Sequence, residues 1–255
     1  LYRGKPTIYD MKTLRWLLLL LPLGAWAQAP DEQDILDRTT AASSPYYYPN
    51  LLLRYRTGDT ALTADDYRYL YYGYAYRDEY RPLETNDALD RTLLLASSID
   101  PEKPRVEDLE ALLAAGLESL ERDPFSPKVL NLLAFAYGAL GDEVQEKAYY
   151  DRMNKVLATI EASGDGLTER SPRHILMFDH ALDLLAAAEL VPGKSRIVSR
   201  TTEYVPLMAP VQREDRKIKG YYFDFSRIYR HKPEGYTYKR DRTWQFNNLK
   251  PREYK

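Results

Sequence analysis

The sequence has no cysteine among its 255 residues. This absence excludes disulfide bonds, zinc sites built on thiolates and a lipid anchor attached through cysteine. The fold therefore depends on packing alone. A chain of this length with 44% hydrophobic residues can bury a sizeable core.

Histidine is also scarce, and no motif for catalysis or phosphate binding is present. Three histidines occur, at His174, His180 and His231. None has the HExxH spacing of a zinc protease, and His180 shares only one helical face with Asp179 and Asp183. No GxSxG, SxxK, GxGxxG or P-loop pattern occurs either. The sequence therefore predicts no catalytic residue, no cofactor and no metal site.

Long apolar runs are absent except near the start of the chain. There, two basic residues precede the apolar run 16–23, and the sequence AWA at 25–27 has the small-x-small pattern of a signal-peptidase site. The run is too short to span a bilayer as a helix. We interpret residues 1–27 as an upstream extension and a cleavable signal peptide, the alternative being an amphipathic or buried helix of the mature protein. Export to the periplasm or cell surface is expected, with no membrane-spanning segment in the mature chain.

The net charge is close to zero, at −2, but the charges are unevenly distributed. Without residues 1–27 the chain has a net charge of about −5. The segment 227–255 is a basic, aromatic tail, whereas the body before it is acidic. We expect this tail either to fold back onto the acidic body or to reach an anionic surface. Nucleic acid is not an expected partner of an exported chain.

The most distinctive segment is 46–80, which holds 11 of the 23 tyrosines. Thr63 and Asp66 have the spacing of a capping box, so we expect a helix from Thr63 to about Tyr80. Gly73 lies inside this helix and costs about 1 kcal/mol relative to alanine. A glycine at this position indicates close approach by another backbone or by a ligand.

Helical spacing divides these tyrosines between two opposed faces. The candidate binding surface comprises Tyr67, Tyr69, Tyr71, Tyr72, Tyr74, Tyr76 and Arg77. One interpretation is a packing layer between helices, and the other is an aromatic, arginine-lined groove for a peptide, glycan or partner protein. Because many buried hydroxyls are hard to satisfy, the two faces should differ in burial. The first face comprises Tyr67, Tyr71 and Tyr74, and the second comprises Tyr69, Tyr72 and Tyr76.

Hydrophobic periodicity and turn residues divide the mature chain into segments. Residues 28–45 are a lead-in with a short acidic helix at 32–38. Residues 46–166 are a helical-hairpin domain, with further helices expected at 87–99, 106–122, 127–140 and 143–162. Residues 167–226 are a small α+β unit, with strands expected at 174–178, 196–208 and 217–226 and a helix at 179–189. The predicted fold class is α+β, mainly α-helical hairpins followed by a small C-terminal α/β-sheet unit.

Part of the helical domain resembles tetratricopeptide repeats. SLERDP at 119–124 is similar to the end of one unit, and LNLLAFAYGALGD at 130–142 is similar to the first helix and turn of the next. The resemblance covers about one and a half units, which implies stacked antiparallel hairpins rather than a regular superhelix.

A second resemblance covers most of residues 45–226. It depends on four pieces in order: GDTALTADDYRYLYYGYAYRDEYRP at 58–82, RDPF at 122–125, SGDG at 163–166 and YYFDFS at 221–226. With these pieces the chain resembles an exported family of Bacteroidales-type Gram-negative bacteria that is catalogued as domain of unknown function 4919. The resemblance implies export and a shared fold, but no activity.

The expected function is that of an exported, non-catalytic binding or scaffolding protein of the bacterial envelope, with a protein, peptide or glycan as partner. The alternative is an unrecognised hydrolase that acts on envelope or dietary polymers through an acidic residue beside the tyrosines. A pocket in which two carboxylates, or a histidine and a carboxylate, converge within hydrogen-bond reach would distinguish the hydrolase.

Overall fold

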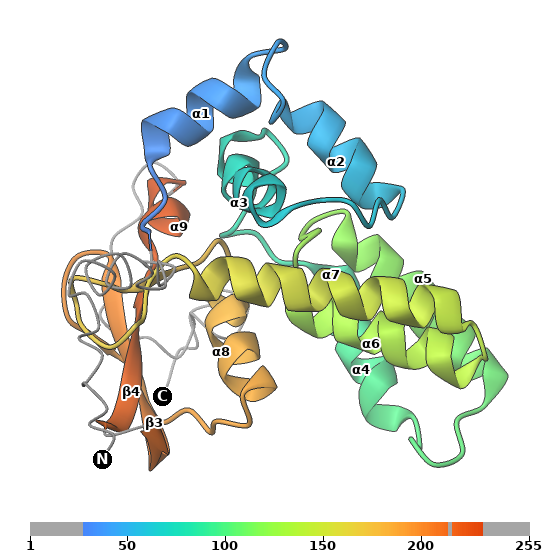
Figure 1. Cartoon of the computed structure of the whole chain (residues 1–255). Helices are drawn as coiled ribbons and strands as arrows, with labels where there is room; N and C mark the ends of the chain where they lie inside the picture. Colours follow the sequence, from blue (N-terminus) through green and yellow to red (C-terminus); the bar gives the residue numbers. More distant parts are fainter. Residues whose placement is uncertain (1–27, 214–215, 232–255) are drawn as a thin grey trace, which may run out of the picture.

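The computed structural model describes residues 28–213 and 216–231. Helices come first and a mixed sheet last (Figure 1), so the predicted α+β class is confirmed. The helices are α1 (Glu32–Thr40), α2 (Tyr48–Arg56), α3 (Ala64–Gly73), the 3-10 helix η2 (Tyr74–Tyr76), α4 (Asp87–Ser98), α5 (Val106–Leu120), α6 (Pro127–Ala139), α7 (Glu143–Glu161), α8 (Phe178–Ala187) and α9 (Ser226–Arg230). The strands are β1 (Arg173–His174), β2 (Arg196–Ile197), β3 (Thr202–Arg213) and β4 (Arg216–Asp224). The predicted signal segment lies outside the described residues.

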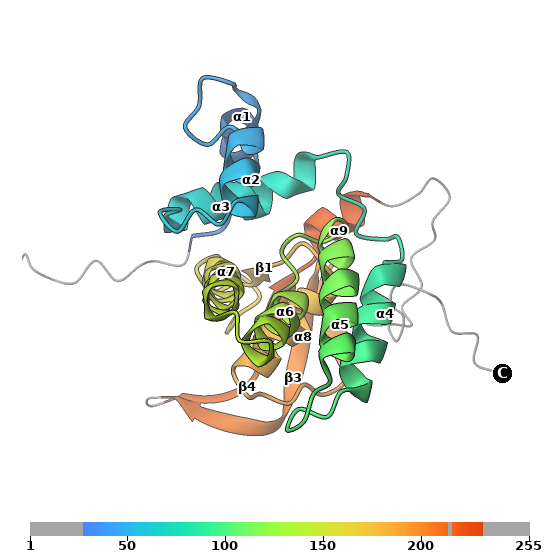
Figure 2. The same cartoon turned by 90° about the vertical axis from the view of Figure 1, so that its right-hand side faces the viewer.

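The first seven helices form two layers (Figures 1 and 2). In the first layer α1 and α2 pack on α3, and α3 packs on α7 of the second layer. That layer continues through α6, α5 and α4, each packed on its neighbour in the chain. Gly141, in the turn between α6 and α7, has a φ of 83° that favours glycine. The expected helical hairpins are therefore present, while their tetratricopeptide character stays a prediction.

The sheet has the strand order β1-β4-β3-β2. β3 and β4 form an antiparallel hairpin, and β1 pairs with β4 in parallel. Tyr221 and Phe223, two alternate residues of β4, are buried in the main hydrophobic cluster. In Figure 1, α8 lies between this sheet and the helical layers. The sheet is thus packed as part of the same body as the helices.

Two strand predictions in this unit are wrong in extent. The strand expected at 196–208 is two antiparallel strands, because the chain reverses where the Val198 N–H donates to the Thr202 carbonyl. The strand expected at 174–178 is only the two-residue β1, and α8 begins at Phe178. Ile175 and Leu176, whose hydrophobicity suggested a longer strand, are buried in the main hydrophobic cluster.

α1 belongs to the core, although the sequence presents it as a lead-in. Asp31 caps this helix by accepting hydrogen bonds from the backbone N–H groups of Gln33 and Asp34. Ile35 is fully buried in the main cluster, and α1 packs on α3. The expected acidic helix is therefore confirmed, but it is not a free tether.

The start of the predicted basic tail folds back onto α1. The Arg227 side chain is 1% exposed, forms an ion pair with Glu32 and lies 4.8 Å from the centre of the Tyr72 ring. Arg230 binds the other carboxylate oxygen of Glu32 at 2.7 Å. These contacts confirm the expected return of the tail to the acidic body for its first residues. The rest of the tail, 232–255, lies outside the described residues.

The tyrosine helix begins where the sequence predicts and ends earlier. Thr63 and Asp66 form the two reciprocal bonds of a capping box. α3 stops after ten residues and continues as η2, so the expected extension to about Tyr80 is wrong. Tyr80 is 1% exposed and its hydroxyl donates to the Leu176 carbonyl at 2.7 Å. This tertiary contact, which periodicity does not show, fixes the chain away from the helix axis.

Candidate functional site

Neither face of the tyrosine helix is open to solvent. Tyr67, Tyr71 and Tyr74 are 3%, 0% and 4% exposed, and Tyr69 and Tyr72 are 7% and 1% exposed. Only Tyr76 is partly exposed. The expected difference in burial between the two faces is therefore wrong, and the six tyrosines do not form an open aromatic surface.

Distant parts of the chain satisfy the tyrosine hydroxyls. Tyr72 donates to the backbone carbonyl of His174, 102 residues away, at 3.1 Å. Tyr69 donates to the Asp34 carboxylate, 35 residues away, at 2.6 Å. Each such bond offsets the cost of about 1–3 kcal/mol of burying an unpaired hydroxyl. The expectation of an open face failed because these acceptors come from elements that no local pattern connects to α3.

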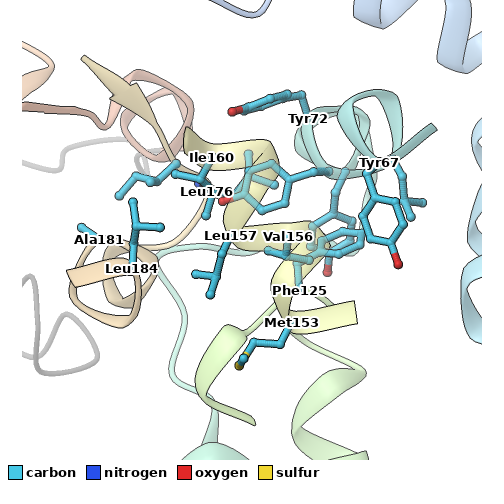
Figure 3. Close-up of a cluster of buried hydrophobic side chains, with 14 of the residues drawn as sticks. Tyr67, Tyr72, Phe125, Met153, Val156, Leu157, Ile160, Leu176, Ala181 and Leu184 are labelled. Carbon is cyan, nitrogen blue, oxygen red and sulfur yellow. Dashed lines mark hydrogen bonds between the residues drawn. The ribbon is translucent and has the colours of Figure 1, made fainter. Parts of the chain in front are cut away.

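Figure 3 shows the centre of the core that these tyrosines join. Tyr72 of α3 belongs to the same buried cluster as Leu157 and Ile160 of α7. Leu176 and Leu184, from the C-terminal unit, belong to the same cluster. The helical segment and the sheet unit, which the sequence treats separately, therefore share one hydrophobic core.

The end of the tyrosine segment borders a surface cleft of about 510 Å³, named here the Arg77 cleft. Its lining includes Tyr48, Leu52, Arg56, Tyr76, Arg77 and Glu121. The volume lies within the range of roughly 300–1,000 Å³ that is typical of small-ligand sites. Three of the seven candidate residues, Tyr74, Tyr76 and Arg77, line this cleft. The structure thus brings the end of the predicted surface to this cleft, whereas Tyr67, Tyr69, Tyr71 and Tyr72 are buried.

Two buried polar atoms at the Arg77 cleft, Tyr48 Oη and Arg77 Nε, have no hydrogen-bond partner in the described part of the chain. The Arg77 guanidinium carbon lies 5.0 Å from the centre of the Tyr48 ring. Burial raises the pKa of the Tyr48 hydroxyl well above its usual range, Tyr74 raises it further, and Arg77 lowers it. Tyr48, Tyr74 and Arg77 all line the cleft, and the Tyr48 hydroxyl itself is buried. Folded proteins seldom leave such buried groups unpaired.

Charges of both signs surround the Arg77 cleft. Arg56 and Glu121 form an exposed ion pair with each other at 3.3 Å. Asp78 and Glu79 also line the cleft and are exposed. Arg77 has no ion pair within residues 28–213 and 216–231. The Nε of its guanidinium is therefore a hydrogen-bond donor that no described residue uses.

Sequence reasoning missed the cleft residues that α2 and the end of α5 contribute. Tyr48 and Arg56 come from α2, and Glu121 directly follows α5. No spacing rule connects these positions to Arg77, because the chain between them forms several separate elements. The only signal was the location of Tyr48 within the tyrosine-rich segment.

A second pocket, of about 420 Å³, lies at the start of α3. Gln28, Tyr67, Arg68 and Tyr72 are among its lining residues. The Gln28 N–H donates to the Ala162 carbonyl at 3.0 Å, and Arg68 donates to the Gln28 side chain at 3.2 Å. Among the residues that the structure describes, no buried side-chain polar atom of this pocket lacks a partner. This pocket therefore shows no unmet hydrogen-bonding group.

His180 is at the centre of a buried polar cluster. Its Nδ1 lies 2.7 Å from the Tyr71 hydroxyl, and its Nε2 lies 2.9 Å from the Asp123 carboxylate. The Leu176 N–H donates to the same tyrosine hydroxyl at 3.2 Å. Burial opposes protonation of His180, but nearby carboxylates, chiefly that of Asp123, outweigh burial and raise the imidazole pKa. The ring is 0% exposed and both of its nitrogens are engaged.

A cavity of about 60 Å³ lies beside this cluster, and three carboxylates line it, those of Glu84, Asp123 and Asp179. Burial raises the pKa of Asp179 to about 6, against the opposing effect of Lys128. The pair formed by His180 and Asp123 is within the hydrogen-bond reach that the hydrolase alternative requires. The cavity, however, has room for only a few water molecules. Since His180 is enclosed, this arrangement stabilises the fold and has no room for a sugar ring or peptide.

The described residues offer neither a metal cluster nor a membrane-spanning helix. No group of three or more histidine, cysteine, aspartate or glutamate side chains among them is arranged to hold a metal ion. None of their helices is both long and apolar enough to cross a bilayer.

The comparison with protein families matches residues 33–233 to a domain of unknown function, DUF4919. The matched range extends from α1 to α9 and includes both the Arg77 cleft and the His180 cluster. No curated protein and no solved structure matches the chain. Because the match covers most of the sequence, the chain belongs to the DUF4919 family.

Proposed function

We propose that the chain is a non-catalytic binding or scaffolding protein of the bacterial envelope, exported through the signal peptide predicted at 1–27, and that the Arg77 cleft is its ligand site. One observation supports this proposal above the others. Two buried polar atoms at the cleft, Tyr48 Oη and Arg77 Nε, lack partners within the described residues. A ligand that pairs with these groups offsets about 1–3 kcal/mol of unmet hydrogen bonding for each.

The elements around the cleft are held rigidly, which suits a binding site. Tyr74 donates to the Arg122 carbonyl at 3.1 Å, and Tyr80 donates to the Leu176 carbonyl at 2.7 Å. These two bonds fix the chain on both sides of Arg77. A ligand therefore meets a preformed wall, and less of its binding free energy is lost in ordering the protein.

A hydrolase is the second candidate function, favoured by two carboxylates at one cavity, Asp123 and Asp179, and by the contact of Asp123 with His180. It requires the cavity to open before a polymer can enter. Hydrolysis of an envelope or plant polysaccharide that is lost in Asp123→Asn and Asp179→Asn, but kept in Arg77→Ala, would favour this candidate. Equal activity in all three variants would assign the hydrolysis to a contaminant.

Co-purification tests the binding function. The mature chain, residues 28–255, is tagged and recovered from the envelope of its native host beside the Arg77→Glu variant. We expect a stoichiometric partner or glycan with the wild type and its loss with Arg77→Glu. The control is Arg170→Glu, a change of an exposed arginine that does not line the cleft. Recovery of the same material with wild type and Arg77→Glu, or of none with either, contradicts the proposal.

N-terminal sequencing of protein from the native host tests export separately. Cleavage at the predicted site leaves Gln28 as the first residue. A first residue at Met11 or earlier contradicts export through this signal.

A further inference from the structure

The charges of the Arg77 cleft indicate the class of its ligand. We infer that the cleft binds a short peptide with a carboxylate for Arg77 and a basic group for Asp78 and Glu79. This inference rests on the proposed binding function and specifies it.

The unpaired guanidinium of Arg77 is the reason to expect a carboxylate on the ligand. This guanidinium is partly buried, has an unpaired Nε and makes no ion pair within the described residues. The planar fork of an arginine matches the two oxygens of a carboxylate, and such paired bonds are among the strongest in proteins. Tyr48 also lines the cleft, and its buried hydroxyl has no hydrogen-bond partner among the described residues.

The basic group follows from the acidic residues next to Arg77. Asp78 and Glu79 are exposed, line the cleft and form no ion pair with another described residue. Glu121 is already neutralised by Arg56 at 3.3 Å. A ligand with only negative charges, such as a uronic acid polymer, would therefore meet two uncompensated carboxylates. A peptide that combines a carboxylate with a lysine or arginine can pair with the positive Arg77 and with the negative Asp78 and Glu79.

The remaining lining suits peptide side chains. Pro49, Leu52 and Pro124 add apolar surface, and Tyr76 is a partly exposed aromatic residue. A neutral glycan would leave the Arg77 guanidinium without an ionic partner. The combination of apolar surface with opposite charges therefore favours a peptide over both neutral and acidic glycans.

Titration calorimetry with short peptides tests the inference. The probes are acetylated tetrapeptides of alanine and leucine with a free C-terminal carboxylate and one lysine, placed at each of the three preceding positions. We expect one of them to bind the mature chain. Its C-terminal amide should bind about 10–100-fold more weakly, because a charge-assisted pair at a partly buried arginine is lost. Replacing the lysine of the peptide by glutamine should weaken binding less, by about 2–5-fold, because Asp78 and Glu79 are exposed.

Variants of the protein assign the carboxylate to Arg77. Arg77→Ala should weaken the carboxylate peptide about 10–100-fold and weaken the amide peptide by a smaller factor, because only the carboxylate forms the charge-assisted pair. Arg77→Lys should restore part of the affinity, since it keeps the charge but loses the fork. The matched control is Arg68→Ala, an arginine of α3 that lines the second pocket instead, which should leave the affinity unchanged. Circular dichroism melting confirms that each variant is folded.

The outcomes separate the inference from the proposed function. Equal affinity for carboxylate and amide peptides overturns the inference. So does Arg77-dependent binding of a galacturonic acid disaccharide without any peptide binding, although the cleft would then still be a ligand site. No peptide binding, together with no Arg77-dependent partner in co-purification, overturns both.

Discussion

At Gly73, side chains of α1 and α2 press against the backbone of α3. A Cβ on this residue would lie 2.8 Å from Thr39 Cγ2 and 3.1 Å from a ring carbon of Tyr48. Gly73→Ala gains about 1 kcal/mol of helix propensity but overpacks the site, which typically costs about 1–3 kcal/mol. Since the neighbours are buried, we predict a net loss of about 0.5–2 kcal/mol in the free energy of unfolding. Urea denaturation measures this change.

A second variant tests the cause. Thr39→Ser removes Cγ2, the atom closest to the added methyl group. In this background Gly73→Ala should cost less, with a coupling of at least about 0.5 kcal/mol between the two changes. The same cost in both backgrounds would show that this contact does not explain the glycine.

Asp179 gives the folded protein a specific dependence on pH. Its carboxyl lies in the first turn of α8, where the helix dipole favours charge, yet burial raises its pKa from 3.8 to about 6. The folded state therefore binds this proton more tightly than the unfolded state, so stability falls as pH rises from about 4 to about 6. We predict that the stability of Asp179→Asn does not fall over this pH range. At pH 7.5 its free energy of unfolding should exceed that of the wild type by about 1–3 kcal/mol. Urea denaturation across pH 4–8 measures both, and parallel curves for the two proteins would contradict the assignment.

At the scale of elements, α9 is attached to α1 by two arginines in different environments. Arg227 and Arg230 bind the same Glu32 carboxylate, with side chains 1% and 47% exposed. Removing one partner of a buried ion pair costs about 3–5 kcal/mol, whereas exposed pairs contribute about 0–1 kcal/mol. In Arg227→Met, Glu32 keeps its ion pair with Arg230, so we predict that the free energy of unfolding falls by about 2–4 kcal/mol. In Arg230→Met it should fall by under about 1 kcal/mol. Denaturant unfolding measures both, and similar losses would mean that α9 is not anchored through Arg227.

Elements with strong local signals were predictable from the sequence. The capping box at Thr63 set the start of α3, and leucine spacing with flanking prolines located α5 and α6. The end of α3 was not predictable, because a contact between Tyr80 and a residue 96 positions away decides it. Likewise, the reversal between β2 and β3 depends on backbone hydrogen bonds, and the sequence 196–208 predicts a single strand there.

At the scale of the whole molecule, the α+β class followed from periodicity, but the site did not. The sequence located the tyrosine segment and named Tyr76 and Arg77 among its candidates. It could not show that acceptors from α1 and the C-terminal unit would satisfy the buried hydroxyls. Nor could it show that α2 would place Tyr48 beside Arg77. Both features arise from contacts between segments far apart in the chain, which single-sequence patterns do not contain.

The tyrosines of α3 are part of the core, and Tyr76 and Arg77, which follow α3, line the cleft that we propose as the ligand site. The most direct measurement is the two-dimensional ¹H–¹⁵N NMR spectrum of the mature chain during titration with the tightest-binding lysine-containing carboxylate peptide. Saturable shifts are expected for the backbone signals of Tyr76, Arg77 and Asp78, with those of Tyr67 and Tyr71 unchanged. Shifts centred on the pocket at Gln28 or on the His180 cluster, or no shifts at all, would contradict the claim.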